Sequence, residues 1–319
     1  MKDGQGRTID YLRISVTDRC DLRCVYCMPE CGVPSLSHET VLRYEEILRL
    51  ARIFAVLGIR KIRLTGGEPL TRKGLAQLVA ALSTVSGIET IAMTTNGMLL
   101  SDMLPQLLDA GLSSVNISLD TLDEAVFTAI TRRSGLKRVL DAIERAAAVP
   151  TFGVKLNCVP TELNRNGIPA LTAYAAERRI PLRFIELMPI GEGRNIRGLC
   201  EAEVSDILEN AFGPLSPIVP EAPDKCRRFL LPGGGEIGFI SPMSHKFCAQ
   251  CSRIRLTADG KLKTCLQYDV GADLRALLSE DDASISEAIA QAILHKPLCH
   301  HFGEAASHTD TRKMFEIGG

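Results

Sequence analysis

The sequence predicts an α/β fold: a partial, TIM-like barrel of about six strand–helix units, open along one side and followed by a C-terminal extension. One observation is that strand-like and helix-like hydrophobic patterns alternate up to about residue 190, and such alternation specifies parallel strands with right-handed crossovers. The other is length, because a closed barrel of eight units takes about 250 residues. We therefore divide the chain into a barrel over residues 1–195 and an extension over residues 196–319.

Each unit is predicted from its pattern and from the residues that end it. The helix expected over 43–57 has apolar residues at helical spacing and ends at Gly58, which can adopt the left-handed conformation of a helix C-terminus. Ser101 is expected to cap a helix that ends at Gly111. In the extension, the residues before and after the turn at 232–235 predict a hairpin. The barrel strands are expected over 11–16, 59–64, 88–94, 114–119, 153–157 and 182–188.

Composition limits the class of protein. The chain has 319 residues, of which 45% are hydrophobic, and a net charge of −1, which supports a large core and argues against a nucleic-acid scaffold. No run of 18 apolar residues appears, so we expect no membrane span. Residues 1–7 lack the apolar segment of a secretory signal. We therefore expect a cytoplasmic protein whose thiols are reduced.

Three cysteines, Cys20, Cys24 and Cys27, fill the loop after the first strand. Disulfides need an oxidising compartment, and structural zinc sites usually have four ligands in paired units. Three close thiolates without a fourth suit a four-iron cluster with one iron left open for another ligand. Zinc and unligated cysteine remain alternatives. Cys31 is close enough to be a rival ligand, although a bystander in the loop is the favoured interpretation.

A second group of cysteines lies in the extension. Cys248 and Cys251 are separated by two residues, and Cys265 follows after thirteen intervening residues. Judged alone, this pattern favours zinc, with His245 or another cysteine as the fourth ligand. Because only three cysteines are regularly spaced, as in the first group, a second cluster with an open iron is the other interpretation.

Both groups occur within longer motifs that resemble a known family. The cysteine loop and the turn Gly66-Gly67-Glu68-Pro69, each at the end of a predicted strand, together resemble the radical S-adenosylmethionine (SAM) superfamily. Segments 11–20, 63–69, 183–188 and 248–255, with the ending 317–319, are similar to the GTP 3′,8-cyclase family within it. The resemblance covers residues 7–319, is looser around 131–137, and leaves Cys31 as an extra cysteine.

The resemblance implies an enzyme with two [4Fe-4S] clusters, SAM as a cofactor and GTP as the substrate. The first cluster would reductively cleave SAM to a 5′-deoxyadenosyl radical, which removes the hydrogen from ribose C3′. The carbon radical would then attack guanine C8 to give (8S)-3′,8-cyclo-7,8-dihydroguanosine 5′-triphosphate. This is the first step of molybdenum cofactor biosynthesis, and the cofactors supply the difficult chemistry.

The resemblance also assigns roles by position. The clusters would be bound by Cys20, Cys24 and Cys27 and by Cys248, Cys251 and Cys265. SAM would contact Tyr26, Gly67, Ser118 and Met188. GTP would contact Arg13, Arg63, Thr94, Lys155, Arg253 and Arg255. The residues assigned to catalysis are Arg13, Gly318 and Gly319.

The strand patterns give the basic residues an independent meaning. Arg13, Arg63 and Lys155 interrupt apolar strands, and an unpaired buried charge is costly, so a bound anion is a natural partner. A salt bridge to an inward carboxylate is the alternative. Arg253 and Arg255 alternate beside Cys251, which directs both side chains to one face of a strand.

The expected partners are GTP, an electron donor such as a flavodoxin-like protein or another reductase, and the next enzyme of the pathway, cyclic pyranopterin monophosphate synthase. We expect no nucleic acid and no membrane partner, and the chain is a monomer or a homodimer. Two other functions stay open: another radical SAM enzyme with an auxiliary cluster, such as a peptide maturase, and a non-enzymatic metal-binding scaffold. A maturase would not need Arg253, Arg255 or the Gly-Gly ending.

Overall fold

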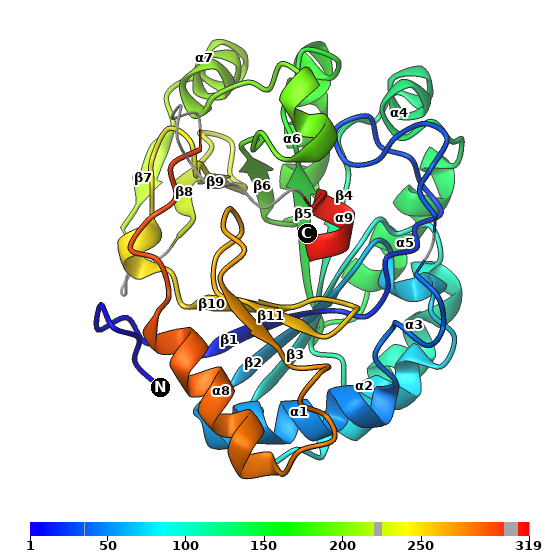
Figure 1. Cartoon of the computed structure of the whole chain (residues 1–319). Coiled ribbons are helices and arrows are strands. Elements are labelled where there is room, and N and C mark those ends of the chain that lie inside the picture. Colours follow the sequence, from blue (N-terminus) through cyan, green and yellow to red (C-terminus); the bar gives the residue numbers. More distant parts are fainter. Residues whose placement is uncertain (35, 220–224, 303–311, 319) are drawn as a thin grey trace.

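The computed structural model describes residues 1–34, 36–219, 225–302 and 312–318. In these residues, twelve strands form one sheet in the order β12-β11-β10-β1-β2-β3-β4-β5-β6-β9-β8-β7, and its two edges do not pair (Figure 1). Strands β1 to β6 are consecutive and parallel. This arrangement confirms the expected α/β partial barrel. The six strands are β1 (Tyr11–Ser15), β2 (Lys61–Thr65), β3 (Thr90–Thr95), β4 (Ser114–Ser118), β5 (Gly153–Cys158) and β6 (Leu182–Ile185).

The extension adds strands to both edges of this sheet. Strand β10 (Arg253–Leu256) lies parallel to β1, and β11 (Lys261–Lys263) and β12 (Gly271–Asp273) follow it outward. On the other edge, β9 (Glu236–Ile240) lies parallel to β6, with β8 (Arg227–Leu230) and β7 (Ser216–Ile218) beyond it. The β8–β9 pair is the predicted hairpin. The division at residue 195 stays a prediction.

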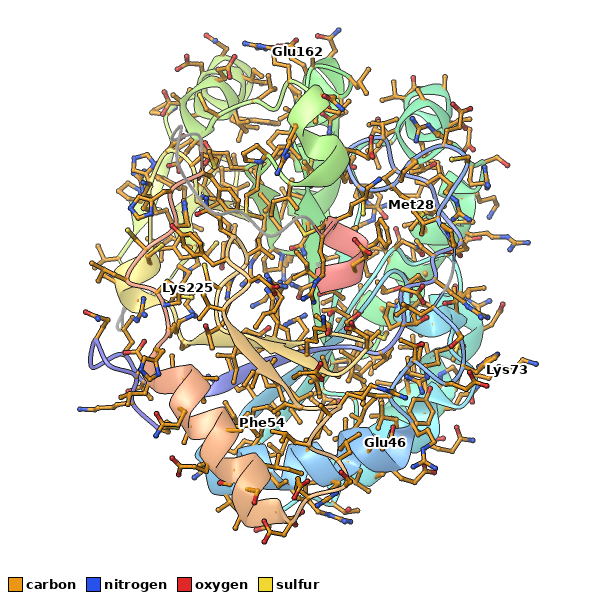
Figure 2. All side chains as sticks on the ribbon, viewed as in Figure 1. Met28, Glu46, Phe54, Lys73, Glu162 and Lys225 are labelled. Carbon is orange, nitrogen blue, oxygen red and sulfur yellow. The ribbon has the colours of Figure 1, made fainter. Side chains whose placement is uncertain are left out.

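Helices cover the outer face of the barrel (Figure 1). Leu12, Ile14 and Phe54 are fully buried between the strands and these helices, and Figure 2 shows Phe54 on the inner side of α1. Neighbouring residues on a strand point to opposite faces. The alternate residues of β1, Tyr11, Arg13 and Ser15, therefore face the barrel interior. The helices of the barrel are α1 (Tyr44–Val56), α2 (Leu75–Ser83), α3 (Leu100–Asp109), α4 (Glu124–Thr131), α5 (Leu136–Ala147) and α6 (Ile168–Glu177).

Two predicted helix ends have different outcomes. Gly58 follows α1 with φ of +100° and donates its N–H to Ala55, as expected. The assignment of Ser101 as a cap was wrong, because α3 begins at Leu100 and its N-cap residue is Leu99. Ser101 is therefore the second residue of the helix, too far along for its hydroxyl to accept from the first free N–H groups.

The remaining helices belong to the extension. They are α7 (Glu201–Phe212), α8 (Asp282–Leu294) and the four-residue α9 (Met314–Ile317). Arg49 of α1 donates to Asp282 and to the carbonyls of Leu278 and Glu280, which fixes α8 against α1. In contrast, α9 lies within the ring of helices (Figure 1), and Gly318 after it lies beside Ser15 of β1 and Thr65 of β2. No helix among the described residues is long and apolar enough to cross a membrane.

Candidate active site

The first cysteine group lies in the loop between β1 and α1, and neighbouring backbone holds this loop. Arg23 and Val25 donate their N–H groups to the carbonyls of Thr131 and Ile130 at the end of α4, both at 2.9 Å. The Arg132 guanidinium donates to the carbonyls of Arg23 and Met28. The part of the loop from Arg23 to Met28, which carries Cys24 and Cys27, is therefore held against the end of one neighbouring helix.

The three thiols are buried and lie close enough to affect one another. Burial raises the pKa of Cys27 to about 11, and burial and neighbouring charges raise the pKa of Cys20 and Cys24 further. Such thiols lose their protons when a metal supplies the compensating positive charge. Within the described part of the chain, no three His, Cys, Asp or Glu side chains converge as ligands of a single ion would. Cluster ligands bind different irons, so this donor set fits a cluster.

The Gly66–Glu68 turn joins β2 to the cysteine loop. Gly67 and Glu68 donate their N–H groups to Thr17 at 2.8 Å and Arg19 at 2.7 Å. A Cβ on Gly67 would lie 2.3 Å from the Arg19 carbonyl oxygen. The close approach of the Arg19 backbone is therefore enough to require glycine at position 67, without a bound ligand. The assignment of Gly67 to the SAM site stays a prediction.

Glu68 fixes the polar end of this turn. Its carboxyl accepts from the N–H groups of Leu70 and Asn96 at 3.0 and 2.7 Å and from the Thr95 hydroxyl at 2.8 Å. Burial raises its pKa to about 7, against the lowering effect of these donors. The Asn96 amide in turn donates to Asp21 at 2.7 Å, next to Cys20.

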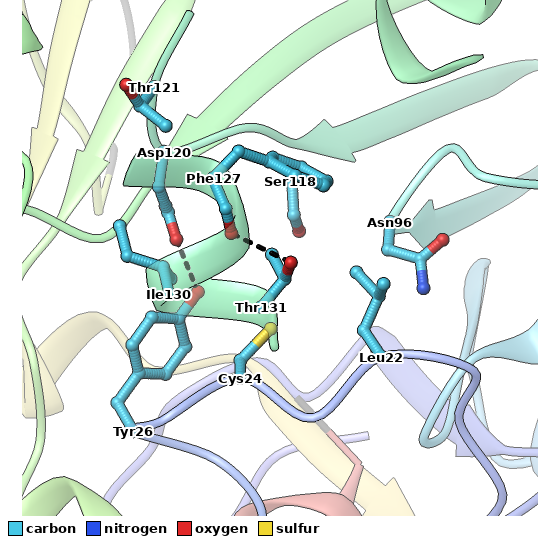
Figure 3. A pocket seen from close by; sticks show the side chains of 10 residues that line it. All are labelled: Leu22, Cys24, Tyr26, Asn96, Ser118, Asp120, Thr121, Phe127, Ile130 and Thr131. Atoms are coloured by element: carbon cyan, nitrogen blue, oxygen red, sulfur yellow. Dashed lines mark hydrogen bonds between the residues drawn. The ribbon is translucent and has the colours of Figure 1, made fainter. Parts of the chain in front are cut away.

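A small cavity of about 30 Å³ opens beside the first cysteine group (Figure 3). Cys24, Tyr26 and Ser118 line it, and the Tyr26 hydroxyl donates to Asp120 at 2.6 Å. Burial raises the pKa of Asp120 to about 6. Two predicted SAM residues therefore share one cavity with a predicted cluster ligand. Met188 lies just beyond β6, where its carbonyl accepts from Ile190 at 2.8 Å.

The second cysteine group is positioned by residues distant in the sequence. Cys248 lies in a short 3₁₀ turn, and its carbonyl accepts from Arg7 at 2.9 Å. The Lys296 ammonium donates to the carbonyls of Arg253 at 2.9 Å and of Thr264. Because these residues flank Cys251 and Cys265, one buried lysine brings the two cysteine-bearing segments together.

The chemistry of this group differs from that of the first. Burial raises the pKa of Cys251, but Lys296, an N–H bond from Arg253 and the charge of Lys225 outweigh it, and the net pKa is lowered. The pKa of Cys248 is raised by burial and by neighbouring thiols, among them Cys299. Sequence reasoning missed Cys299, whose Sγ lies 3.4 Å from His301 Nε2.

The other suggested ligands have partners of their own. His245 lies 3.3 Å from Glu201 through Nδ1 and 3.2 Å from Arg227 through Nε2. Cys31 is exposed and its thiol contacts the Gly32 carbonyl at 3.5 Å.

Between the two cysteine groups lies a cluster of cations, which we call the arginine cluster. Arg13 is opposite Arg255 on one side and Arg63 on the other, so three guanidiniums lie abreast on β10, β1 and β2. Arg253 lies opposite Tyr11, two residues earlier. The cluster consists of Arg13, Arg63, Lys155, Arg183, Arg253 and Arg255.

Arg253 and Arg255 remain charged although the protein encloses them. Burial, with Arg13 beside them, lowers the pKa of Arg253 to about 10 and of Arg255 to about 9, both still above neutral pH. Burial and the charges of Arg183 and Arg63 lower the pKa of Lys155. Like charges placed opposite one another on adjacent strands are unfavourable.

No described carboxylate forms an ion pair with the arginine cluster. The buried Nε atoms of Arg13 and Arg253 have no hydrogen-bond partner among the described residues. Among the residues that the structure describes, no carboxylate is therefore available for the salt-bridge alternative. Uncompensated buried cations are costly, and a bound polyanion would offset this cost.

The structure adds residues that the sequence prediction lacked. Arg183 belongs to the cluster because its charge lowers the pKa of Lys155 and of Arg63. The sequence signal that could have revealed it is an arginine within an apolar strand. Tyr11 accepts from Arg63 Nε at 2.5 Å. Lys225 donates to Ser252 at 2.7 Å, and burial and Arg253 lower its pKa to about 8. Thr94 lies 3.5 Å from Arg63 Nη1.

The segment of α9 and Gly318 enters the arginine cluster. Phe315 and Ile317 are buried, and the Gly318 carbonyl accepts from Arg255. Gly318 has φ of +84°, and a Cβ there would lie 2.9 Å from Thr65 Oγ1. The predicted residue Gly318 is therefore placed between Arg255 and the ends of β1 and β2. Gly319 lies outside the described residues.

Two family models match the chain. The Radical SAM superfamily matches residues 14–162, and Molybdenum Cofactor Synthesis C matches residues 180–302. A GTP 3′,8-cyclase of Clostridium botulinum is 42% identical over 324 residues, covering 100% of both chains. One of Pelotomaculum thermopropionicum is 45% identical over 328 residues, again covering 100% of both.

A solved structure shares the fold. The crystal structure of Streptococcus suis SuiB bound to S-adenosylmethionine superimposes with a TM-score of 0.64 at 15% identity. The superposition covers 91% of this chain and 68% of that one. At this identity the likeness concerns the fold alone.

Proposed function

The chain belongs to the GTP 3′,8-cyclase family of the radical SAM superfamily, and from this membership we propose how its residues divide the work of the reaction. It is a lyase that converts GTP to (8S)-3′,8-cyclo-7,8-dihydroguanosine 5′-triphosphate, the first step of molybdenum cofactor biosynthesis. The observation that carries the proposed division is the arginine cluster, which pairs with no described carboxylate and lies between two groups of three cysteines.

Cys20, Cys24 and Cys27 hold a [4Fe-4S] cluster. With SAM and an electron, this cluster supplies the 5′-deoxyadenosyl radical that takes the hydrogen from ribose C3′. Tyr26 and Ser118, which line the small cavity beside Cys24, would contact SAM next to the cluster. Gly67 and Met188, at the ends of β2 and β6, complete the SAM site and help to exclude water.

Cys248, Cys251 and Cys265 would hold a second [4Fe-4S] cluster, which would supply a site that binds the substrate. The support for this assignment is the repeated set of three thiols, the cations around Cys251 and the match to Molybdenum Cofactor Synthesis C over this region. Lys296 fixes the two cysteine-bearing segments relative to each other.

The arginine cluster binds the triphosphate of GTP. Arg13, Arg253 and Arg255 approach it from β1 and β10, and Arg63, Thr94 and Lys155 from β2, β3 and β5. Guanidiniums bind phosphate oxygens with two parallel hydrogen bonds, which fixes the orientation as well as the position of the nucleotide. The ribose is thereby held between the two cysteine groups, with Arg13 and Gly318 at the reacting end.

The direct test is anaerobic incubation of the cluster-loaded protein with SAM, GTP and dithionite, followed by mass analysis. We expect the cyclised triphosphate and 5′-deoxyadenosine, both dependent on SAM. A zinc-loaded, colourless protein that gives neither product would contradict the proposal. SAM cleavage unaffected by GTP, with no cyclised product, would favour a different radical SAM reaction.

Arg253→Ala and Arg255→Ala should each weaken GTP binding. A lost hydrogen bond to a charged group costs about 1.5–3 kcal/mol, which corresponds to about a tenfold to a hundredfold rise in Kd. Equilibrium binding at fixed salt measures this change. Arg52→Ala removes the same charge from the exposed face of α1 and should leave Kd unchanged. Unchanged affinity in both cluster variants would count against the assignment.

The partners and location follow from this chemistry. A flavodoxin-like protein or another reductase supplies the electron, and cyclic pyranopterin monophosphate synthase receives the product. Cluster-bound cysteines and a GTP substrate favour the cytoplasm, where thiols stay reduced. Neither nucleic acid nor a membrane is needed, and a homodimer is compatible with this chemistry.

A further inference from the structure

The phenol of Tyr11 lies within the arginine cluster. Tyr11 is on β1, directly opposite Arg253 of β10 and two residues before Arg13. The Arg63 Nε–H donates to its hydroxyl oxygen at 2.5 Å. The Arg63 Nη1 donates to the Met93 carbonyl at 2.9 Å, so two fixed acceptors define the plane of this guanidinium.

The charges around Tyr11 come from every neighbouring element. Burial raises the pKa of Tyr11, but the charges of Arg13 and Arg63, the bond from Arg63 and the charge of Arg253 outweigh it and lower the pKa to about 7. As the pH rises through 7, the phenol therefore becomes a tyrosinate. The charged groups are Arg13 on β1, Arg63 on β2, Arg253 and Arg255 on β10, and Lys225, with Asp10 beside it.

We propose that Tyr11 is a positioning residue that orients Arg63 and supplies the negative charge of the arginine cluster when no triphosphate is bound. The proposal rests on the assignment of the cluster to the triphosphate of GTP. The phenolate and the phosphates then compete for the same guanidiniums. When GTP binds, its phosphates draw on the positive charges that had stabilised the phenolate. The phenolate therefore takes up a proton, while the hydrogen bond from Arg63 to its oxygen persists.

Linkage sets the expected size of this effect. Tyr11 would have one pKa in the free protein and a higher pKa in the GTP complex. At a pH between these two values, GTP binding is accompanied by the uptake of about one proton. Above pH 7, the Kd of the wild-type protein should therefore rise by up to about tenfold per pH unit. Below pH 7, where Tyr11 is already neutral, it contributes no such rise.

Calorimetry of GTP binding to the cluster-loaded protein tests whether Tyr11 takes up a proton when GTP binds. The titrations are made at pH 8, without SAM or reductant. Titrations in buffers of different ionisation enthalpy give the number of protons taken up. We expect Tyr11→Phe to take up about one proton fewer than the wild type. Tyr174→Phe, whose hydroxyl bonds Glu144 outside the barrel, should match the wild type. The difference due to Tyr11→Phe should persist with Lys225→Met, which removes the other group that titrates near this pH.

A spectroscopic measurement separates charge from structure. GTP should decrease the ultraviolet absorbance of tyrosinate at pH 8 in the wild type and in Tyr174→Phe, but not in Tyr11→Phe. GTP binding with equal proton uptake in the wild type and Tyr11→Phe would overturn this inference and leave the proposed function intact. Failure of the wild type to bind GTP would overturn both.

Discussion

Cys24→Ala is expected to abolish reductive cleavage of SAM while iron remains at the second cysteine group. Cys24 lines the cavity that Tyr26 and Ser118 share, in the part of the loop that the end of α4 holds. The measurements are iron and sulfide content and 5′-deoxyadenosine formed with dithionite. We expect about half of the wild-type iron and no detectable 5′-deoxyadenosine, on the rule that open-site clusters of this kind need all three thiolates.

The matched control is Cys31→Ala, which removes an exposed thiol from the same loop and should retain full iron and activity. The reciprocal change, Cys251→Ala, should leave SAM cleavage possible but stop GTP turnover. If either single change removed the iron of both clusters from a protein that stayed folded, the two sites would not be independent.

Gly318→Ala is expected to retain both clusters and GTP binding but to lose cyclisation by about a hundredfold, the typical cost of a misplacement of about 1 Å near a reacting centre. The added methyl group would collide with Thr65 Oγ1 at 2.9 Å and Ser15 Cβ at 3.0 Å. The segment must then move, and the bond from Arg255 to the Gly318 carbonyl moves with it. Product formed per SAM consumed measures the loss.

Gly234→Ala is the matched control for this change. Gly234 has φ of +88°, close to that of Gly318, but a Cβ there meets no atom within 4 Å. Both variants place an alanine at a positive φ, which is unfavourable, and only Gly318→Ala adds the collision. Equal product yields from the two variants would show that the space around Gly318 is not required.

Much of the barrel and both cysteine groups could be predicted because their signals are local. Hydrophobic period, turn glycines and cysteine spacing each depend on a few neighbouring residues. Arg13 and Arg63 were predicted to face inward for the same reason, since they interrupt apolar strands. Ser101 shows where a local signal is ambiguous. A serine just inside a helix has the same sequence signal as a serine that caps it, so the first residue of the helix was misplaced.

The contacts that build the site between distant residues could not be predicted in this way. Whether Arg7 reaches Cys248, or Lys296 spans Arg253 and Thr264, depends on the docking of segments far apart in the chain. The same holds for Cys299, which has no regular spacing to the other cysteines. Tyr11 belongs to segment 11–20, which resembles the family, but its role depends on neighbours that no motif specifies.

The six strand–helix units, the two sets of three thiols and the inward direction of the strand arginines thus follow from local patterns in the chain. The pairing of β10 with the free edge of β1, which places Arg255 opposite Arg13 and Arg253 opposite Tyr11, depends instead on the assembled fold. The assembled fold also decides that Gly318 lies beside Arg255 inside the barrel. The physical reason is that side-chain direction follows from the local backbone, whereas the choice of a partner strand depends on which edges and interior space the rest of the fold leaves open.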